Sequence, residues 1–231
     1  MSGTRTANMQ KRRERILAEA RAVITGPGYD SLNTRSLAKA AGVTVPTLYN
    51  LIGNKEEIMR VLMMESIDRI EERLHDFDHT GPLEMAEAII FQSAALFAED
   101  EMYYQSAAIS ADRAASDSGA HTGWQQLTRR AEQMAARACA AALEQGLLRG
   151  NIPTADLARQ FFICYSGPMR DWTYNVISLE EFKKRVLCGF YICLAADAKD
   201  GFRQLLIRKF QKINGEAGAV SPHSRRAIRS A

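Results

Sequence analysis

The sequence lacks the features of a secreted, disulfide-bonded or membrane-spanning protein. Only four of its 231 residues are cysteine, and no two of them form a CxxC motif. We expect all four to be reduced core thiols of a cytoplasmic protein, namely Cys139, Cys164, Cys188 and Cys193. No apolar run approaches the roughly 20 residues that span a bilayer, and the N-terminus lacks the apolar segment of a signal peptide. We therefore expect no membrane partner.

Histidine is also rare, with four residues in the chain. No nucleophile, base and acid occur together in the sequence, so we predict neither an enzyme nor a cofactor. His75 and His79 have a spacing that could hold a metal ion on one helix face. The alternative is that they lie near a helix C-terminus, where cationic side chains are favourable. We predict no metal site.

Charge is distributed unevenly, although the net charge is only +3. Residues 1–60 contain ten Lys and Arg against five Asp and Glu, whereas residues 61–197 contain twelve against twenty. This division is expected when only one end of a protein meets phosphate. Within the basic segment, residues 11–13 either contact DNA phosphates nonspecifically or form an ordinary solvated helix face. Residues 1–10 should be a flexible arm.

Residues 33–50 have the pattern of two short helices joined by a tight turn. Asn33 or Thr34 can cap a first helix whose apolar face includes Leu37. Gly42 then supplies the turn that ends this helix, because a backbone without a side chain tolerates its conformation. The first helix should therefore be short and half apolar.

Thr44 is the predicted cap of the second helix, and Pro46 fills its first turn, where a missing N–H costs nothing. Leu48 should face the core, which leaves Thr47 and Asn50 pointing outward. Two helices joined in this way form a helix-turn-helix, whose second helix enters the DNA major groove. The alternative is an ordinary helical hairpin, but the outward face lacks the acidic or Lys–Glu residues of a solvated helix. The sequence therefore predicts binding to double-stranded DNA.

The same region resembles the N-terminal domain of tetracycline-repressor-like (TetR family) regulators. The matching residues are Gly28-Tyr29, Leu37-Ala38, Ala41-Gly42-Val43, Thr47-Leu48-Tyr49 and Asn54-Lys55-Glu56-Glu57. The resemblance covers about residues 10–65 and is only architectural beyond them. It implies an all-α fold, with an N-terminal three-helix helix-turn-helix domain and a C-terminal helical ligand-binding and dimerisation domain.

The resemblance also implies which residues contact DNA. Those expected to face bases are Arg35, Val45, Pro46 and Thr47. Those expected to hold phosphates are Thr34, Tyr49, Asn50 and Lys55. Thr44, the cap, completes the predicted set. Val45 offers no hydrogen bond, so its contact would be apolar, for instance with a thymine methyl group. Leu51 and Ile52 depart from the family's aromatic or His and Phe, so the next junction should pack differently.

The remainder of the chain has helical patterns and no alternating strand pattern. Asn54 and Glu57 begin a long linking helix. Later helices are expected at Pro82–Phe97, about Met102–Ala115 and Trp124–Gln145, with a polar loop over Asp117–Gly123. Two further helices, beginning at Thr154 and Ser178, are too apolar around their circumference to face water. We interpret them as the interface of a homodimer; the alternative is a buried helix pair inside a monomer.

In the resembled family the middle helices enclose a ligand pocket. The sequence offers a mostly aromatic lining, although aromatic residues at helical spacing belong more often to a plain core than to a ligand pocket. The candidates are Phe91, Phe97, Tyr103, Tyr104, Ile109, Trp124, Phe162, Tyr165 and Trp172, with Asp112, Arg113, Arg170 and Asp171 as polar anchors. We expect a lipophilic or aromatic small molecule larger than a simple metabolite. Gly167-Pro168 should kink its helix, either at the pocket or at the interface.

Residues 201–231 are predicted to form a basic C-terminal helix and a flexible tail, after a DNA-binding part (1–55) and a helical body (56–200). The helix should dock its apolar stripe on the body; the alternative is a membrane-surface helix. The sequence thus predicts a repressor that binds a pseudo-palindromic operator as a homodimer and leaves it when a small molecule binds. One alternative is an enzyme or ligand carrier whose helix-turn-helix contacts protein. Another is a sequence-tolerant architectural DNA-binding protein.

Overall fold

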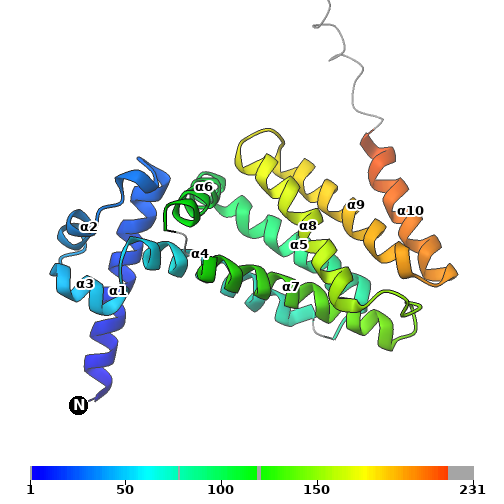
Figure 1. Ribbon diagram of the computed structural model, residues 1–231, viewed down its shortest axis with the longest axis horizontal. Coiled ribbons are helices and arrows are strands. Elements are labelled where there is room, and N and C mark those ends of the chain that lie inside the picture. The colour runs from blue at the N-terminus through cyan, green and yellow to red at the C-terminus, as the bar shows by residue number, and fades with distance from the viewer. Residues whose placement is uncertain (1, 78, 119–120, 218–231) are drawn as a thin grey trace, which may run out of the picture.

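A computed structural model describes residues 2–77, 79–118 and 121–217, and the side chains of residues 5–77, 79–114 and 125–215. Over these ranges the chain is all-α, without any β-strand, as predicted. Figure 1 shows two parts along one long axis, with the N-terminal helices at one end and the C-terminal helix at the other. The two parts have a continuous apolar core.

The N-terminal part consists of α1 (Ser2–Thr25), the short 3-10 helix η1 (Tyr29–Ser31), α2 (Thr34–Ala40) and α3 (Val45–Leu51). Both α2 and α3 pack against α1. The apolar stripe predicted on α1 is buried, with Ile16 and Ala20 fully inaccessible. Burial of this stripe orients the two short helices, which are too short to be stable in isolation.

Residues 2–10 are not the flexible arm that we predicted. They belong to α1, which begins at Ser2. No proline or glycine lies between Thr4 and Thr25, so nothing in the backbone ends the helix before the core stripe begins. Gln10 Nε2 also donates a hydrogen bond to Glu14 Oε1 at 2.9 Å, one turn further along.

The long helix α4 (Lys55–Leu74) links the two parts. Its predicted cap is present, because Asn54 Oδ1 accepts a hydrogen bond from the Glu57 amide at 2.9 Å. The helix ends at Leu74 and is followed by the 3-10 helix η2 (His75–Phe77). His75 and His79 therefore do not share a face of one α-helix. No group of three or more His, Cys, Asp or Glu among the described residues could hold a metal ion.

The body contains six more helices. They are α5 (Pro82–Glu99), α6 (Glu101–Ser118), α7 (His121–Glu144), α8 (Thr154–Thr173), α9 (Leu179–Asp197) and α10 (Asp200–Ala217). The polar loop predicted over Asp117–Gly123 is wrong at both ends, since α6 continues to Ser118 and α7 begins at His121. The helical spacing of the flanking segments extends into these polar residues, whose composition alone does not end a helix. Residues 119–120 lie outside the described ranges.

Helices α7, α8, α9 and α10 pack successively against one another. Ser178, where a helix was predicted to begin, caps α9, since its Oγ accepts from the Glu181 amide at 3.2 Å. As predicted, α10 docks on the body through Phe202 and Leu206, which are buried. No helix in the described ranges has the length and apolar character needed to cross a membrane.

Candidate DNA-binding surface and ligand cavity

The turn between α2 and α3 is built by local hydrogen bonds. Asn33 Oδ1 accepts from the amides of Arg35 and Ser36, at 2.9 and 3.2 Å. Gly42 has φ +64°, a left-handed conformation that a glycine adopts without strain. Thr44 Oγ1 then accepts from the Thr47 amide at 3.3 Å and begins α3. These local contacts set where α2 and α3 begin and where the chain turns between them.

The two short helices divide their side chains between the core and solvent. Leu48 is fully buried, and Leu37 and Ala38 of α2 are nearly so. On the outer surface of α3, Pro46, Tyr49 and Asn50 are exposed and Thr47 is half-buried. Helix α3 therefore presents a small, uncharged surface of the size that a DNA groove accepts.

Three further predicted contact residues differ in exposure. Arg35 is exposed on α2, whereas Thr34 at the start of that helix is half-buried. Val45 is half-buried and packs against the core, so part of its side chain is occupied within the domain. The Thr44 and Thr47 hydroxyl oxygens lie 2.8 Å apart. All of these residues lie in or beside the helix-turn-helix.

Lys55, predicted to hold a phosphate, is oriented by an aromatic ring. Its Nζ lies 3.7 Å from the centroid of the Tyr29 ring, a cation–π contact. Tyr29 follows Gly28, whose φ of +86° turns the chain after α1. The Gly-Tyr pair thus places the ammonium group at the N-terminus of α4, close to the helix-turn-helix.

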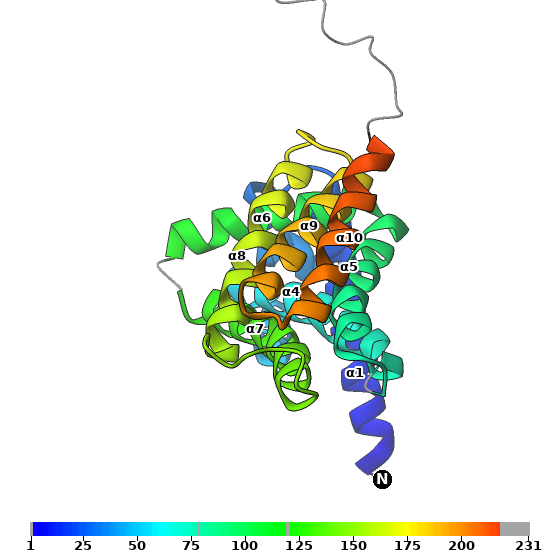
Figure 2. The same ribbon diagram turned by 90° about the vertical axis from the view of Figure 1, so that its right-hand side faces the viewer.

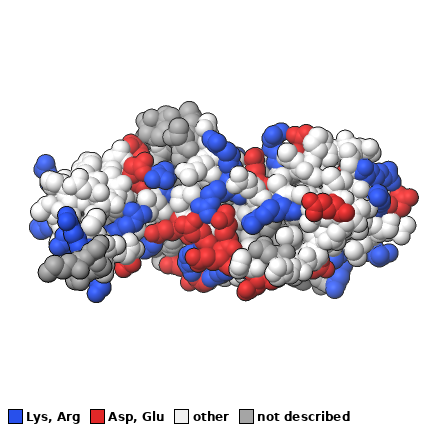
Figure 3. Space-filling model, turned by 90° about the horizontal axis from the view of Figure 1, so that it is seen from below, with Lys and Arg blue, Asp and Glu red and all other residues white. Residues whose placement is uncertain are grey.

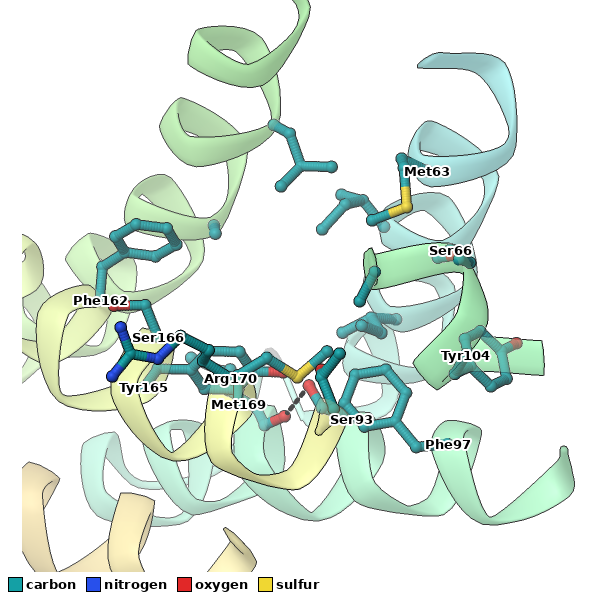
Figure 4. Close-up of a pocket in the computed structure, with 18 of the residues that line it drawn as sticks. Met63, Ser66, Ser93, Phe97, Tyr104, Phe162, Tyr165, Ser166, Met169 and Arg170 are labelled. Carbon is teal, nitrogen blue, oxygen red and sulfur yellow. Dashed lines mark hydrogen bonds between the residues drawn. The ribbon is translucent and has the colours of Figure 1, made fainter. Parts of the chain in front are cut away.

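A cavity of about 190 Å³ lies inside the body, between α4, α5, α6, α7 and α8. Figure 4 shows side chains from these helices pointing into one space, with Met63 and Phe162 on opposite sides of it. Most lining groups are apolar. An engineered cavity of about 150 Å³ in another protein binds benzene, so this one suits a molecule of about one or two rings.

The structure brings part of the predicted ligand set to this cavity. The predicted residues on its wall are Phe97, Tyr104, Asp112, Phe162, Tyr165 and Arg170. Those placed away from it are Phe91, Tyr103, Ile109, Arg113, Asp171 and Trp172. Trp172 is fully buried and stacks on Phe97, with ring centroids 5.0 Å apart. The side chain of Trp124 lies outside the described residues.

Several lining residues were not predicted, because they are not aromatic or charged. They include Met63, Ser66, Ile67 and Ile70 of α4, Ile89 and Ser93 of α5, and Leu127, Ala131 and Met134 of α7. Their helical spacing indicated only a buried face. Which buried residues border a space depends on how the helices cross, and a single helix pattern contains no such information.

The polar groups of the cavity are few, and its two charged residues, Asp112 and Arg170, are exposed to solvent. Burial raises the pKa of Asp112, while the nearby Arg170 guanidinium opposes this shift. Burial also raises the pKa of Tyr165 to about 12, so its hydroxyl remains a hydrogen-bond donor at neutral pH. Ser93 Oγ donates to the Ile89 carbonyl at 2.7 Å. Thr173 Oγ1 is buried without a hydrogen-bond partner in the described structure, which leaves one unsatisfied polar atom in the cavity wall.

The N-terminal helices match a known protein family. Residues 16–62 match the family model described as bacterial regulatory proteins, tetR family. These residues include the core stripe of α1, the entire helix-turn-helix and the start of α4. The N-terminal part of the chain is therefore similar to that of TetR-family regulators. The family-specific residues quoted from the sequence lie in this segment, where the structure forms the expected three-helix domain.

A curated relative of this chain is the HTH-type transcriptional repressor KstR of Rhodococcus jostii (strain RHA1). The two are 32% identical over 88 residues, which is 38% of this chain and 42% of the repressor. The match therefore spans less than half the length of that relative.

The fold of most of the chain is similar to several solved structures. SmeT, the repressor of the Stenotrophomonas maltophilia multidrug efflux pump SmeDEF, aligns with a TM-score of 0.62 and 21% identity, over 82% of this chain and 92% of SmeT. A SmeT–triclosan complex aligns with a TM-score of 0.64 and 22% identity, over 83% and 93%. The fatty acid degradation regulator FadR of Bacillus halodurans aligns at 0.63 with 18% identity, over 79% and 94%. These likenesses show the fold.

Two helices connect the cavity to the N-terminal part that contains the helix-turn-helix. Helix α4 begins beside the helix-turn-helix and contributes Met63, Ser66 and Ile70 to the cavity. Helix α6 lines the same cavity and packs against α1 and η1. Ion pairs also cross the junction, from Arg21 of α1 to Glu65 of α4 and from Arg113 of α6 to Asp30 of η1.

Proposed function

We propose that this protein is a transcriptional repressor that binds a pseudo-palindromic DNA operator as a homodimer and releases it when a small apolar molecule occupies the cavity. The observation that carries the proposal is that α4 and α6 each touch both the cavity and the DNA-binding part. A molecule that displaces either helix changes the position of the helix-turn-helix. In this proposal residues 1–55 bind DNA, residues 56–200 form the helical body, and residues 201–231 form the C-terminal helix and tail.

The DNA-binding step follows from the exposed surface of α3. Pro46, Thr47, Tyr49 and Asn50 would enter the major groove, while Arg35 and Lys55 flank them with positive charge. In a homodimer the two α3 helices must lie about 34–36 Å apart to read successive major grooves. The charge division supports this orientation, since Figure 3 shows acidic side chains gathered over the middle of the molecule.

Dimerisation is proposed through α8 and α9. Each of these helices buries part of its apolar surface within the chain and leaves large side chains exposed, Ile163 at 54% and Ile192 at 59%. An apolar patch of this kind is unfavourable in water unless a partner covers it. A second copy of the chain would cover it symmetrically, giving a four-helix bundle.

The effector is proposed to be a lipophilic or aromatic molecule of about one or two rings, because the cavity is apolar and has a volume of about 190 Å³. Polar orientation would come from the few groups on the wall, such as the Tyr165 hydroxyl and Arg170. The relative SmeT has been solved with triclosan, which supports an aromatic effector in this fold. A larger molecule would require the surrounding helices to separate.

Operator selection followed by release tests the proposal. Duplexes retained by the protein from a random library should share a two-fold symmetric site. Apolar aromatic compounds that raise the melting temperature should then lower affinity for that site, since a ligand releases DNA only if it favours the DNA-incompetent geometry. Retention of duplexes without any shared site would instead favour the architectural alternative. Turnover of a stabilising compound would favour the enzyme alternative.

A further inference from the structure

Helix α1 extends well beyond the core of the helix-turn-helix domain. Every residue from Arg5 to Arg12 is exposed, and full burial begins only at Ile16. Figures 1 and 2 show this end of α1 projecting from the N-terminal part, away from the long axis of the molecule. A solvated helix of this kind gains no stability from packing within its own chain.

The exposed segment carries positive charge along one side. Arg5, Arg12 and Arg15 are spaced by seven and three residues, which places them on neighbouring positions of one helix face. Lys11, Arg12 and Arg15 also border one shallow groove, whose other lining residues are Asn8, Glu14 and Ala18. No ion pair joins any of these basic residues to a carboxylate among the described side chains.

This charge pattern is unfavourable in the absence of an anionic partner. Residues 5–15 contain five basic residues and a single acidic one, Glu14. Lys11 and Arg15 are four residues apart, and like charges at this spacing destabilise a helix. The Glu14 carboxylate accepts a hydrogen bond from Gln10. The basic side chains of the segment therefore remain available to negative charge from outside the chain.

The segment is anchored directly beside the recognition helix. Arg13 Nη1 donates a hydrogen bond to the Leu51 carbonyl at the end of α3, at 3.2 Å. Arg15 lies beside Gly42, in the turn between α2 and α3. Its Nη1 is 3.9 Å from the position that a Cβ atom would occupy on this glycine. The basic side of α1 is thus continuous with the surface that carries α3, and its position relative to α3 is fixed by these contacts.

We propose that the N-terminal segment of α1 binds the phosphate backbone of duplex DNA next to the site read by α3, through Arg5, Lys11 and Arg12. The proposal rests on the proposed DNA-binding function and adds a second, sequence-independent contact to it. From Arg5 to Arg15 the helix spans about 15 Å, which matches about four phosphates along one strand. The contact would add affinity on every sequence and select none.

The test is the salt dependence of DNA binding by the full chain. In the variant Arg5→Gln/Lys11→Gln/Arg12→Gln, the slope of log affinity against log salt should fall by about 2 to 3 per bound chain, since each lost phosphate contact removes about 0.9. The loss should be equal on operator and scrambled duplexes. The melting temperature should not fall, because these side chains are exposed and their removal relieves the repulsion between like charges.

Two matched variants make the result specific. Lys199→Gln/Arg208→Gln/Lys212→Gln removes the same charge from exposed positions at the other end of the molecule and should leave the slope unchanged. Arg5→Lys/Arg12→Lys keeps the charge and should retain the wild-type slope.

An unchanged slope in the α1 variant overturns the proposal, even if operator recognition is intact. A lost affinity for anionic vesicles with unchanged DNA binding would also overturn it, by assigning the segment to a membrane surface. If the wild-type protein binds no DNA, the proposed function itself fails.

Discussion

Arg113 of α6 forms an ion pair with Asp30 of η1, across the junction between the body and the DNA-binding part. The two side chains are 56% and 69% exposed, so water screens their attraction and the pair contributes at most about 1 kcal/mol to stability. Its importance lies in its position. Helix α6 also lines the cavity, so the pair is a direct contact between the ligand-responsive helix and the segment that precedes the helix-turn-helix.

Arg113→Ala should therefore change coupling more than stability. We expect a shift in melting temperature no larger than that of Arg137→Ala, an exposed control on α7, but a several-fold change in the effector concentration that releases DNA. Effector affinity in the absence of DNA should be unchanged, because Arg113 does not line the cavity. Titration of DNA release and calorimetry of effector binding measure the two quantities. Coincident release curves for the variant and the wild-type protein would contradict the expectation.

Thr47 and Lys55 should have different roles in DNA binding. Thr47→Ala removes a hydroxyl from the first turn of α3 and should reduce operator affinity by ~1–3 kcal/mol, with little loss on scrambled DNA. Lys55→Ala should weaken both duplexes equally, because a phosphate contact carries no sequence information. Competition binding on the two duplexes distinguishes the outcomes. Equal losses for Thr47→Ala would remove its base-reading role. Tyr29→Phe is a useful control, since it keeps the ring beneath Lys55.

The α8–α9 interface can be tested without damaging the core. Leu187 of α9 is only 4% exposed within a single chain. A charge there would unfold the protein whatever its oligomeric state. Ile192→Asp is the better probe, because this side chain is exposed, and it should convert a dimer into a folded monomer of 25.7 kDa.

Light scattering measures the mass, and far-UV circular dichroism checks the fold. Met102→Asp, at a similarly exposed apolar position on α6, should leave the dimer intact. A wild-type mass equal to that of one chain at micromolar concentration would disprove the interface, as would an Ile192→Asp protein that remains dimeric.

Filling the cavity should separate effector binding from DNA binding. Ala131 of α7 lines the cavity, and Ala131→Leu would place three more carbon atoms in it. We expect stabilising compounds to lose at least tenfold in affinity, while operator binding remains and becomes insensitive to them. Ala140→Leu, on the same helix but away from the cavity, should retain the wild-type response. Unaltered compound affinity in Ala131→Leu would place the binding site elsewhere.

The pKa of Tyr165 predicts a specific alkaline instability. Burial raises this pKa to about 12 in the folded protein, compared with about 10 in an unfolded chain. As the pH rises, Tyr165 therefore loses its proton in the unfolded state before it does so in the folded state. The contribution of this hydroxyl to the free energy of unfolding is fully present below about pH 10 and declines as the pH rises towards 12. Tyr165→Phe should show a shallower decline between about pH 9 and 11. Urea unfolding at both pH values measures it, with the exposed Tyr49→Phe as control. An identical decline in both variants would exclude Tyr165 as a source of the instability.

The sequence determined the helix-turn-helix almost completely, because its signals are local. Asn33 and Thr44 each cap a helix through amides two or three residues away, and Gly42 supplies the left-handed turn between them. Such contacts do not depend on the rest of the fold. The apolar spacing of α4, α8 and α9 likewise predicted buried helices, since burial of a stripe requires only that some partner exists.

The tertiary structure alone decided which buried residues border the cavity. Tyr103 and Tyr104 are adjacent and both nearly buried, yet only Tyr104 lies on its wall. Trp172 and Tyr165 belong to the same aromatic stripe of α8. Tyr165 lines the cavity, whereas the Trp172 ring stacks on the Phe97 ring and does not line it. The difference arises because a cavity is the space left where several helices cross. Its lining depends on contacts between residues far apart in the chain, which the period of a single helix does not contain.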